Sequence, residues 1–194
     1  MMPTISNWPL EHWIYFIKMI KIHQSNQNDL SDNNINRLHD LINQVYAEAE
    51  DGMWLENSSR ITKSEVREML ENEQLVLAMS DGKIVGSVKK LKINSTTCEF
   101  GILVADETFR GQGIGSSLVN AFENWAIAAG FKTLQLALLT PRDWEQPSKE
   151  FLKKWYSRIG YIPERTESFA ARYHHRAHEM ATECDFTVWK KQLD

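Results

Sequence analysis

The chain has 194 residues, of which 42% are hydrophobic and 25% are charged, and its formal net charge at pH 7 is −4. This length and balance predict one soluble domain with its own core, and the net negative charge argues against nucleic acid as a partner. Two cysteines are too few for a disulfide framework, so we expect reduced thiols in a cytoplasmic protein.

Residues 1–18 are interpreted as an N-terminal appendage, and residues 19–194 as the folded domain. The most apolar run of the appendage, Trp13–Ile17, is too short to span a bilayer. It also lacks the basic start and the small-residue cleavage site of a signal peptide. We therefore expect no membrane association, and we expect the appendage to pack on the domain or, alternatively, to form a homodimer contact.

The first half of the domain predicts a strand, two helices and then three strands. Residues 19–23 favour the first strand, and apolar residues at helical spacing predict a helix over residues 34–49. Thr62 and Glu65 have the spacing of a capping box and open the second helix. The dipeptide Asp81-Gly82 is a strong hairpin signal. The three strands are expected at residues 75–79, 83–93 and 98–105.

The second half predicts alternating helices and strands. Apolar residues at helical spacing run from residue 114 to Gly130, and residues 134–139 are nearly all apolar, which is typical of a strand buried on both faces. A helix is expected from Pro147 to Gly160. The last strands are expected at residues 161–162 and 186–189, and we assign no structure to the segment 168–183 between them.

This order of elements indicates a single mixed α/β domain. We expect a central, twisted, mixed sheet of six to seven strands, flanked by about four helices. A helical crossover joins two central parallel strands in this arrangement.

A glycine-rich turn, here called the glycine turn, connects the strand at residues 98–105 to the following helix and reads Arg110-Gly111-Gln112-Gly113-Ile114-Gly115. Such a turn exposes backbone N–H groups beside the positive end of a helix dipole, which suits a pyrophosphate. It lacks the lysine of a Walker A loop, and its glycine spacing is too short for a Rossmann fingerprint. The sequence therefore predicts an anion site outside these two classes.

The glycine turn does match the pattern Arg/Gln-x-x-Gly-x-Gly/Ala between a strand and a helix. A second motif spans Phe151–Tyr161, where a helix ends in a tyrosine and turns through a glycine to an aromatic residue. On these two motifs the chain resembles the GNAT superfamily of acyl-CoA-dependent N-acyltransferases, over roughly residues 20–193. The resemblance implies an acetyltransferase domain that uses acetyl-CoA as co-substrate, without a metal.

The resemblance also implies where acetyl-CoA binds. Its pyrophosphate would lie on the glycine turn and Ser116, mainly against backbone N–H groups. Its pantetheine arm would lie beside Leu103 and Val104 like an extra strand, at a point where two central strands diverge. A backbone N–H near Val104 would then hold the developing oxyanion.

Acyl transfer to an amine also needs an acid for the leaving thiolate and a route for the amine's proton. Tyr156 matches the family's tyrosine and is the expected general acid; the alternative is an aromatic residue packed on the sheet. Glu99 is the candidate base. The alternatives are a carboxylate that only binds the acceptor, a solvent-facing residue, and a water path without a fixed base.

Strand alternation predicts a face for each residue from 99 to 104. Glu99, Gly101 and Leu103 would share one face of the strand. The other face would carry Phe100, Ile102 and Val104.

The helix of the second motif departs from the family pattern. Its lysines are interpreted as a solvated helix face or, alternatively, as contacts to coenzyme phosphates. These lysines are Lys149, Lys153 and Lys154.

The resemblance implies that the first two helices, their loop and the last strands form the acceptor pocket. Acidic residues beside Trp54 in this loop suit a cationic amine, whereas the alternative is a solvated, flexible loop. These acidic residues are Glu48, Glu50, Asp51 and Glu56. We expect the primary amine of a small molecule as acceptor; the alternatives are a protein or peptide N-acetyltransferase and a non-catalytic acyl-CoA-binding sensor.

The segment 168–183 contains histidines at helical spacing, His174 and His178. They lack the His-Glu-x-x-His order of a zinc helix and have no carboxylate or cysteine at a matching spacing. We therefore expect a surface helix or loop that covers the acceptor site, and no metal.

Overall fold

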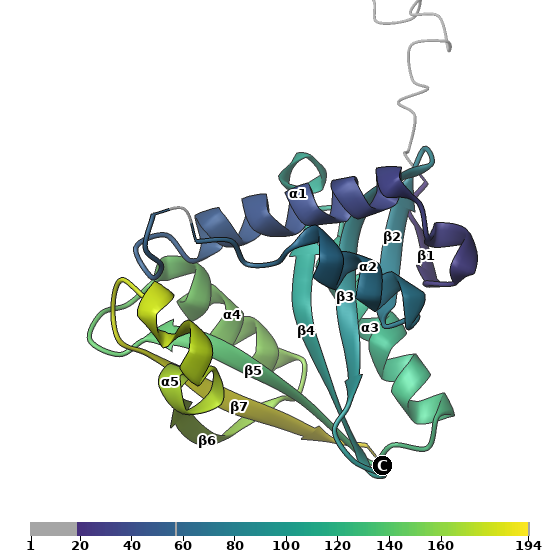
Figure 1. Ribbon diagram of the computed structural model, residues 1–194. Helices are drawn as coiled ribbons and strands as arrows, with labels where there is room; N and C mark the ends of the chain where they lie inside the picture. The colour runs from purple at the N-terminus through teal and green to yellow at the C-terminus, as the bar shows by residue number, and fades with distance from the viewer. Residues whose placement is uncertain (1–18, 57, 194) are drawn as a thin grey trace, which may run out of the picture.

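A computed structural model describes residues 19–56 and 58–193 of the chain (Figure 1). Within them, seven strands form one sheet in the order β1-β2-β3-β4-β5-β7-β6. The strands are β1 (Lys21–Gln24), β2 (Leu75–Ser80), β3 (Lys83–Lys92), β4 (Thr97–Ala105), β5 (Thr133–Pro141), β6 (Ile162–Ser168) and β7 (Cys184–Gln192). The expected appendage and its dimer contact lie outside the described residues.

Helices cover both faces of this sheet (Figure 1). The α-helices are α1 (Asp32–Ala49), α2 (Lys63–Glu71), α3 (Ile114–Ala128), α4 (Pro147–Arg158) and α5 (Phe169–Arg172), and the short 3-10 helices are η2 (Gln27–Asp29), η3 (Glu107–Phe109) and η4 (His174–Glu179). Apolar side chains of α1 and α2 share one core with strand residues, and those of α3 and α4 share another. The mixed α/β fold predicted from the sequence is confirmed.

Local sequence signals explain where these elements begin. The side chain of Ser31 accepts a hydrogen bond from the backbone N–H of Asn34, so α1 begins slightly earlier than predicted. Thr62 and Glu65 make both hydrogen bonds of the predicted capping box at α2. Asp81 and its following glycine have positive φ values of 50° and 74°, as a tight hairpin between β2 and β3 requires.

Strands β4 and β5 are parallel and are joined by α3, whereas the other neighbouring strands are antiparallel. Between Gly101 and Val104, β4 carries one residue more than the facing stretch of β3, and Ile102 in this β-bulge has a φ of 49°. A bulge bends its strand, and β4 pairs with β5 over residues 97–100 only. Beyond this point the two strands diverge, as the family resemblance implied.

The bulge also changes which side chains of β4 share a face. Ile102 and Val104 pack in the core of α1 and α2. Leu103 packs in the other core, together with Phe100. The predicted alternation, which placed Leu103 with Glu99, is therefore wrong beyond Gly101, because one extra residue reverses the alternation of all that follow.

Candidate active site

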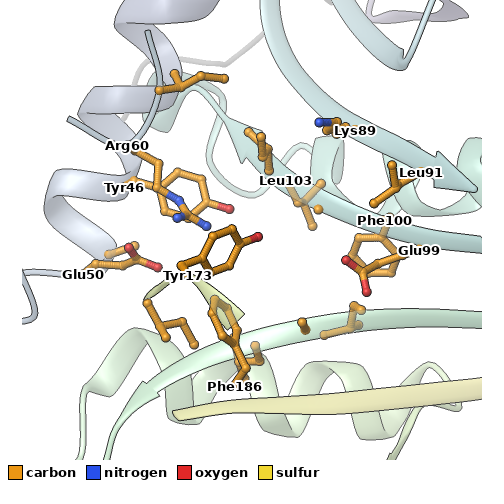
Figure 2. Close-up of a pocket in the computed structure, with 18 of the residues that line it drawn as sticks. Tyr46, Glu50, Arg60, Lys89, Leu91, Glu99, Phe100, Leu103, Tyr173 and Phe186 are labelled. Atoms are coloured by element: carbon orange, nitrogen blue, oxygen red, sulfur yellow. The ribbon is translucent and has the colours of Figure 1, made fainter. Parts of the chain in front are cut away.

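A cavity of about 550 Å³ lies where β4 and β5 diverge. Its wall includes side chains from α1, β4, β7 and the segment that follows β6, among them Tyr46, Glu99, Tyr173 and Phe186 (Figure 2). The cavity therefore collects residues from both halves of the chain at the opening in the sheet. Openings between strands of a mixed sheet are common ligand sites.

The edge of β4 that faces this opening has no strand beside it beyond residue 100 among the described residues. Unpaired N–H and C=O groups on such an edge can accept an extended ligand as an added strand. Gly101, Ile102 and Leu103 line the cavity along this edge. Val104 is 1% exposed, pairs with Ser87 of β3 and is not among the residues that line the cavity.

The glycine turn follows β4 and η3 and leads directly into α3. Arg110 to Gly113 are exposed, and Gly111 and Gly113 have positive φ values of 80° and 74°. A Cβ added at either glycine would meet no atom within 4 Å. The first turn of α3 has no side-chain cap and no acidic residue, so no side chain caps the N–H groups at the positive helix end. This geometry supports an anion site.

A glycine outside the motif fixes the start of α3 against the sheet. A Cβ added at Gly86 on β3 would lie 2.7 Å from Cγ2 of Ile114 and 2.9 Å from the carbonyl oxygen of Val104. Only glycine fits at this separation without a shift of its neighbours. Gly86 thereby lets the helix start lie close to the end of β4. Sequence reasoning missed it, because its partners are distant in sequence.

Tyr156 extends from α4 into the cavity wall and is 5% exposed. Its ring centroid lies 5.9 Å from that of Phe100 on β4 and 6.4 Å from that of Trp189 on β7. Burial, and secondarily the charge of Tyr46, raise the pKa of Tyr156 above its usual value. The phenol therefore stays protonated at neutral and moderately alkaline pH, which is the state that an acid needs. Its position fits aromatic packing on the sheet, and its role as general acid stays a prediction.

Glu99 lies on β4 at the cavity and is 7% exposed, so the alternative of a solvent-facing residue is wrong. Its Oε1 accepts a hydrogen bond of 2.9 Å from Nη2 of Arg172, and its Oε2 accepts one of 2.7 Å from Nε2 of Gln135. Gln135 is its direct neighbour on β5, at the last stretch where the two strands pair. These contacts fix the carboxylate at the edge of the opening.

The acidic residues that were expected to bind a cationic amine do not all lie at the cavity. Of these four residues only Glu50 lines the cavity. Its Oε1 lies 2.7 Å from Nζ of Lys149, and its Oε2 accepts a hydrogen bond of 2.6 Å from Nε1 of Trp54. Lys149 is 3% exposed, so the interpretation as a solvated helix face is wrong for this lysine. The lysine neutralises the carboxylate that the sequence assigned to a cationic acceptor.

The pKa of Lys149 is lowered because burial disfavours its charged form, while the adjacent Glu50 acts in the opposite direction. The same helix end is also tied to α1 through Ser148, whose hydroxyl donates a 2.7 Å hydrogen bond to the carbonyl of Ala49. Two consecutive residues therefore join the start of α4 to the end of α1.

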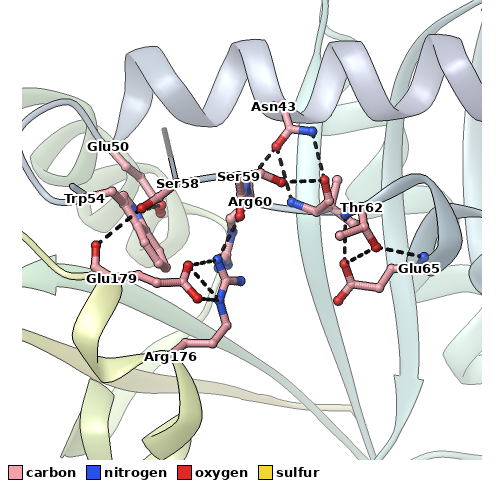
Figure 3. A network of polar contacts seen from close by, with 11 residues as sticks. Asn43, Glu50, Trp54, Ser58, Ser59, Arg60, Thr62, Glu65, Arg176 and Glu179 are labelled. Atoms are coloured by element: carbon pink, nitrogen blue, oxygen red, sulfur yellow. Dashed lines mark hydrogen bonds and ion pairs between the residues drawn. The ribbon is translucent and has the colours of Figure 1, made fainter. Parts of the chain in front are cut away.

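The segment 168–183 contributes Phe169, Arg172, Tyr173 and Arg176 to the wall of the cavity; that it covers an acceptor stays a prediction. Its Glu179 accepts a backbone hydrogen bond of 2.8 Å from Leu55, and its Ala181 donates one of 3.0 Å to Met53. Nη2 of Arg176 donates a 2.7 Å bond to the carbonyl of Ser59 (Figure 3). This segment, here called the roof, is thus joined to the α1–α2 connection by two backbone hydrogen bonds and by the side chain of Arg176. It forms α5 and η4, whereas no structure was assigned to it from the sequence.

No group of three or more His, Cys, Asp or Glu side chains is placed to hold a metal ion in residues 19–56 and 58–193. Over the same residues, no helix combines the length and apolar character needed to cross a membrane.

Comparison with known proteins identifies the family of this fold. The sequence profile of the Acetyltransferase (GNAT) family matches residues 36–161, more than half of the chain. The chain therefore belongs to this family. It is also similar to the dTDP-fucosamine acetyltransferase of Escherichia coli O6:H1, with 32% identity over 84 residues. The match covers 43% of this chain and 32% of that protein, so the chain spans about a third of this relative's length.

Solved structures share the fold at low identity. The PaiA N-acetyltransferase of Thermoplasma acidophilum, in complex with coenzyme A, has a TM-score of 0.66 at 14% identity, over 90% of this chain and 99% of that one. A GNAT family acetyltransferase from Elizabethkingia anophelis with acetyl-CoA bound has a TM-score of 0.60 at 19% identity, over 90% and 98%. An aminoglycoside 6'-N-acetyltransferase complexed with coenzyme A gives 0.62 at 20% identity, over 89% and 96%.

Proposed function

We propose that this chain transfers the acetyl group of acetyl-CoA to the primary amine of a small molecule, by direct attack in a ternary complex. The observation that carries the proposal is the roofed cavity at the opening between β4 and β5, with Tyr156 in its wall. The glycine turn and the free edge of β4 approach this opening from one side. The roof restricts the other side, which favours a small acceptor over a protein segment.

In this proposal, main-chain groups make most of the contacts to acetyl-CoA. The glycine turn and Ser116 offer N–H groups to the pyrophosphate at the start of α3. The edge of β4 at Leu103 and Val104 offers main-chain groups to the pantetheine arm. The bulge at Ile102 turns this edge away from β5, which makes room for the thioester at the opening. A backbone N–H near Val104 would stabilise the oxyanion.

In the chemical step, the amine nitrogen forms a bond to the acetyl carbonyl carbon and the carbon–sulfur bond breaks. The Tyr156 hydroxyl donates its proton to the leaving thiolate. The amine loses a proton to Glu99, directly or through a water path. Arg172 and Gln135 already donate hydrogen bonds to both oxygens of Glu99. Besides accepting the proton, Glu99 therefore also orients the amine. This proton then restores Tyr156 through solvent before the next turnover.

The location and assembly of the protein follow as proposals too. Both cysteines, Cys98 and Cys184, are buried free thiols, which supports a reducing, cytoplasmic environment. We also propose that residues 1–18 are an appendage of the domain at residues 19–194, and that the appendage forms a homodimer contact.

Release of coenzyme A from acetyl-CoA, measured with polyamines, amino acids, aminoglycosides and peptides, tests the proposal. Tyr156→Phe should lower kcat by about 10²- to 10⁴-fold and leave the Kd for acetyl-CoA, measured by calorimetry, within about 2-fold. Tyr161→Phe is the matched control, because Tyr161 is buried in the same core and its hydroxyl donates to Glu123 instead of lining the cavity.

Tight acetyl-CoA binding without release by any amine would favour the sensor alternative and overturn the enzyme. Release with peptides alone would favour a protein N-acetyltransferase. Unchanged turnover of Tyr156→Phe would remove the tyrosine from the mechanism and leave the enzyme in place.

A further inference from the structure

Arg60 in the cavity wall is a cation without a carboxylate partner. It lies on the connection between α1 and α2, and no ion pair involves it within residues 19–56 and 58–193. Lys149, Arg172 and Arg176 of the same wall each have one, at 2.7, 2.9 and 2.6 Å. Lys89 on β3 also lacks one among the described residues, but it is only half-buried. The Nε atom of Arg60 is buried and has no hydrogen-bond partner among the described residues. A buried donor without a partner is costly, so a ligand that supplies the acceptor would gain affinity.

The position of Arg60 is fixed by its neighbours. Oδ1 of Asn43 accepts a 2.8 Å hydrogen bond from the backbone N–H of Arg60 (Figure 3). The guanidinium carbon lies 4.8 Å from the ring centroid of Tyr46 and 5.8 Å from that of Trp54. Stacking on aromatic rings holds a guanidinium while its edge remains available for hydrogen bonds. The arginine is therefore organised before a ligand arrives.

Among the charged groups around Arg60, Glu50 has the largest influence on its pKa. Both oxygens of Glu50 already have partners. Lys149 and Trp54 take its two oxygens at 2.7 and 2.6 Å. Burial acts to lower the pKa of Arg60, whereas the charges of Glu50, Tyr46 and Tyr173 act to raise it, and the net shift is upward. Arg60 therefore remains charged. A carboxylate of the ligand would meet a permanent cation here.

Arg60 and Glu99 lie on opposite sides of the cavity in Figure 2, with Tyr173 between them. We propose that the acceptor is a primary amine that also carries a carboxylate, as an amino acid does, and that Arg60 binds this carboxylate through Nε–H and the adjacent Nη–H. The amine then points to the β4 side, where Glu99 lies. This inference rests on the proposed function and narrows the cationic acceptor that the sequence suggested to a zwitterionic one.

The test compares amino acids with their own carboxamides as acceptors, because each pair shares the amine and side chain and differs in the anionic group. Glycine and the L-amino acids that carry a primary amine, each with its amide, serve as probes, with coenzyme A release as the readout. We expect the best amino acid to exceed its amide in kcat/KM by about 10- to 100-fold, the size of a charge-assisted hydrogen bond. Arg60→Met should reduce this ratio to within about 2-fold, mainly through the acceptor KM.

Arg67→Met is the matched control, since Arg67 is an exposed arginine of α2 that pairs with Asp32 outside the cavity; it should keep the ratio. For Arg60→Lys the ratio should lie between those of Arg60→Met and Arg67→Met, because lysine keeps the charge but lacks the paired N–H groups of the guanidinium. Equal or better activity with the amides, in the unmodified enzyme, would overturn the inference even where Arg60→Met does not fold. Absence of release with every amine would instead overturn the proposed function.

Discussion

The two sides of the opening between β4 and β5 are built in different ways. On the side of α3, consecutive residues of the glycine turn present exposed main chain, and the side chains have little part. On the side of α1 and the roof, charged side chains distant in sequence meet in pairs, Glu50 with Lys149 and Glu99 with Arg172. We call these four residues the charged wall. The comparison shows that a candidate active site can combine a half formed by consecutive residues with a half that exists only after folding.

The charged wall carries the largest expected effect, at Lys149. Lys149→Ala leaves Glu50 buried without its cation, and breaking such a pair costs about 3–5 kcal/mol. We expect the free energy of unfolding, measured in urea, to fall by this amount. Lys153→Ala on the same helix is the matched control: its pair with Glu150 is partly exposed, so about 0–1 kcal/mol is expected.

The double variant Lys149→Met/Glu50→Gln separates burial from charge. It removes both charges and should recover a large part of the loss, because a buried polar or apolar pair needs no ion partner. A loss for Lys149→Ala no larger than that for Lys153→Ala would mean that the charged wall contributes little to folding, and the contrast between the two sides would fail.

The next effect is expected beneath the glycine turn, at Gly86. Gly86→Ala would place a Cβ 2.7 Å from Ile114 and 2.9 Å from the Val104 carbonyl, and such overpacking costs about 1–3 kcal/mol. Because the clash lies at the start of α3, we also expect a raised KM for acetyl-CoA. Gly101→Ala is the comparison for stability alone, since a Cβ there meets no atom within 4 Å. Equal unfolding energies of the two variants would show that the close approach is not constrained.

These differences explain how much could be predicted from the sequence. The order of strands and helices, the capping box at Thr62 and the glycine turn depend on residues near one another in the chain, and the sequence predicted them. The partner of Lys149 and the unpaired state of Arg60 depend on residues brought together by folding, so spacing could not show them. The bulge at Ile102 is a local feature, but the sequence did not predict it. A positive φ at a residue other than glycine cannot be recognised from a pattern of apolar residues.

The glycine turn itself should respond less, and mainly in coenzyme binding. Gly113→Ala places a side chain at a φ of 74°, which costs about 1–2 kcal/mol, and puts its Cβ where the pyrophosphate would approach. We expect a rise of about 5-fold or more in the KM for acetyl-CoA. Gly130→Ala, at a φ of 80° at the other end of α3, should match it in stability and leave this KM unchanged. The same KM change in both variants would contradict a role of the turn in binding.

The smallest expected effect lies at the boundary of the two sides, in the alkaline pH dependence of Tyr156. Its raised pKa, caused first by burial, means that the acid form persists above the usual tyrosine value of about 10. Since the acid role proposed for Tyr156 needs this form, kcat should show no fall due to Tyr156 between about pH 8 and pH 10.

Stability follows the same sign: a raised folded-state pKa stabilises the protein fully below about pH 10, and this contribution is lost as the pH rises further. Tyr161 has a raised pKa as well, through burial and then Glu123, so it shares the loss of stability without an effect on kcat. A fall in kcat with a midpoint well below pH 10, present in Tyr161→Phe and absent in Tyr156→Phe, would show that Tyr156 ionises more readily than its packing allows. The phenol would then be accessible to water. The ring contacts around Tyr156 would not exclude water from the boundary between the main-chain side and the charged wall.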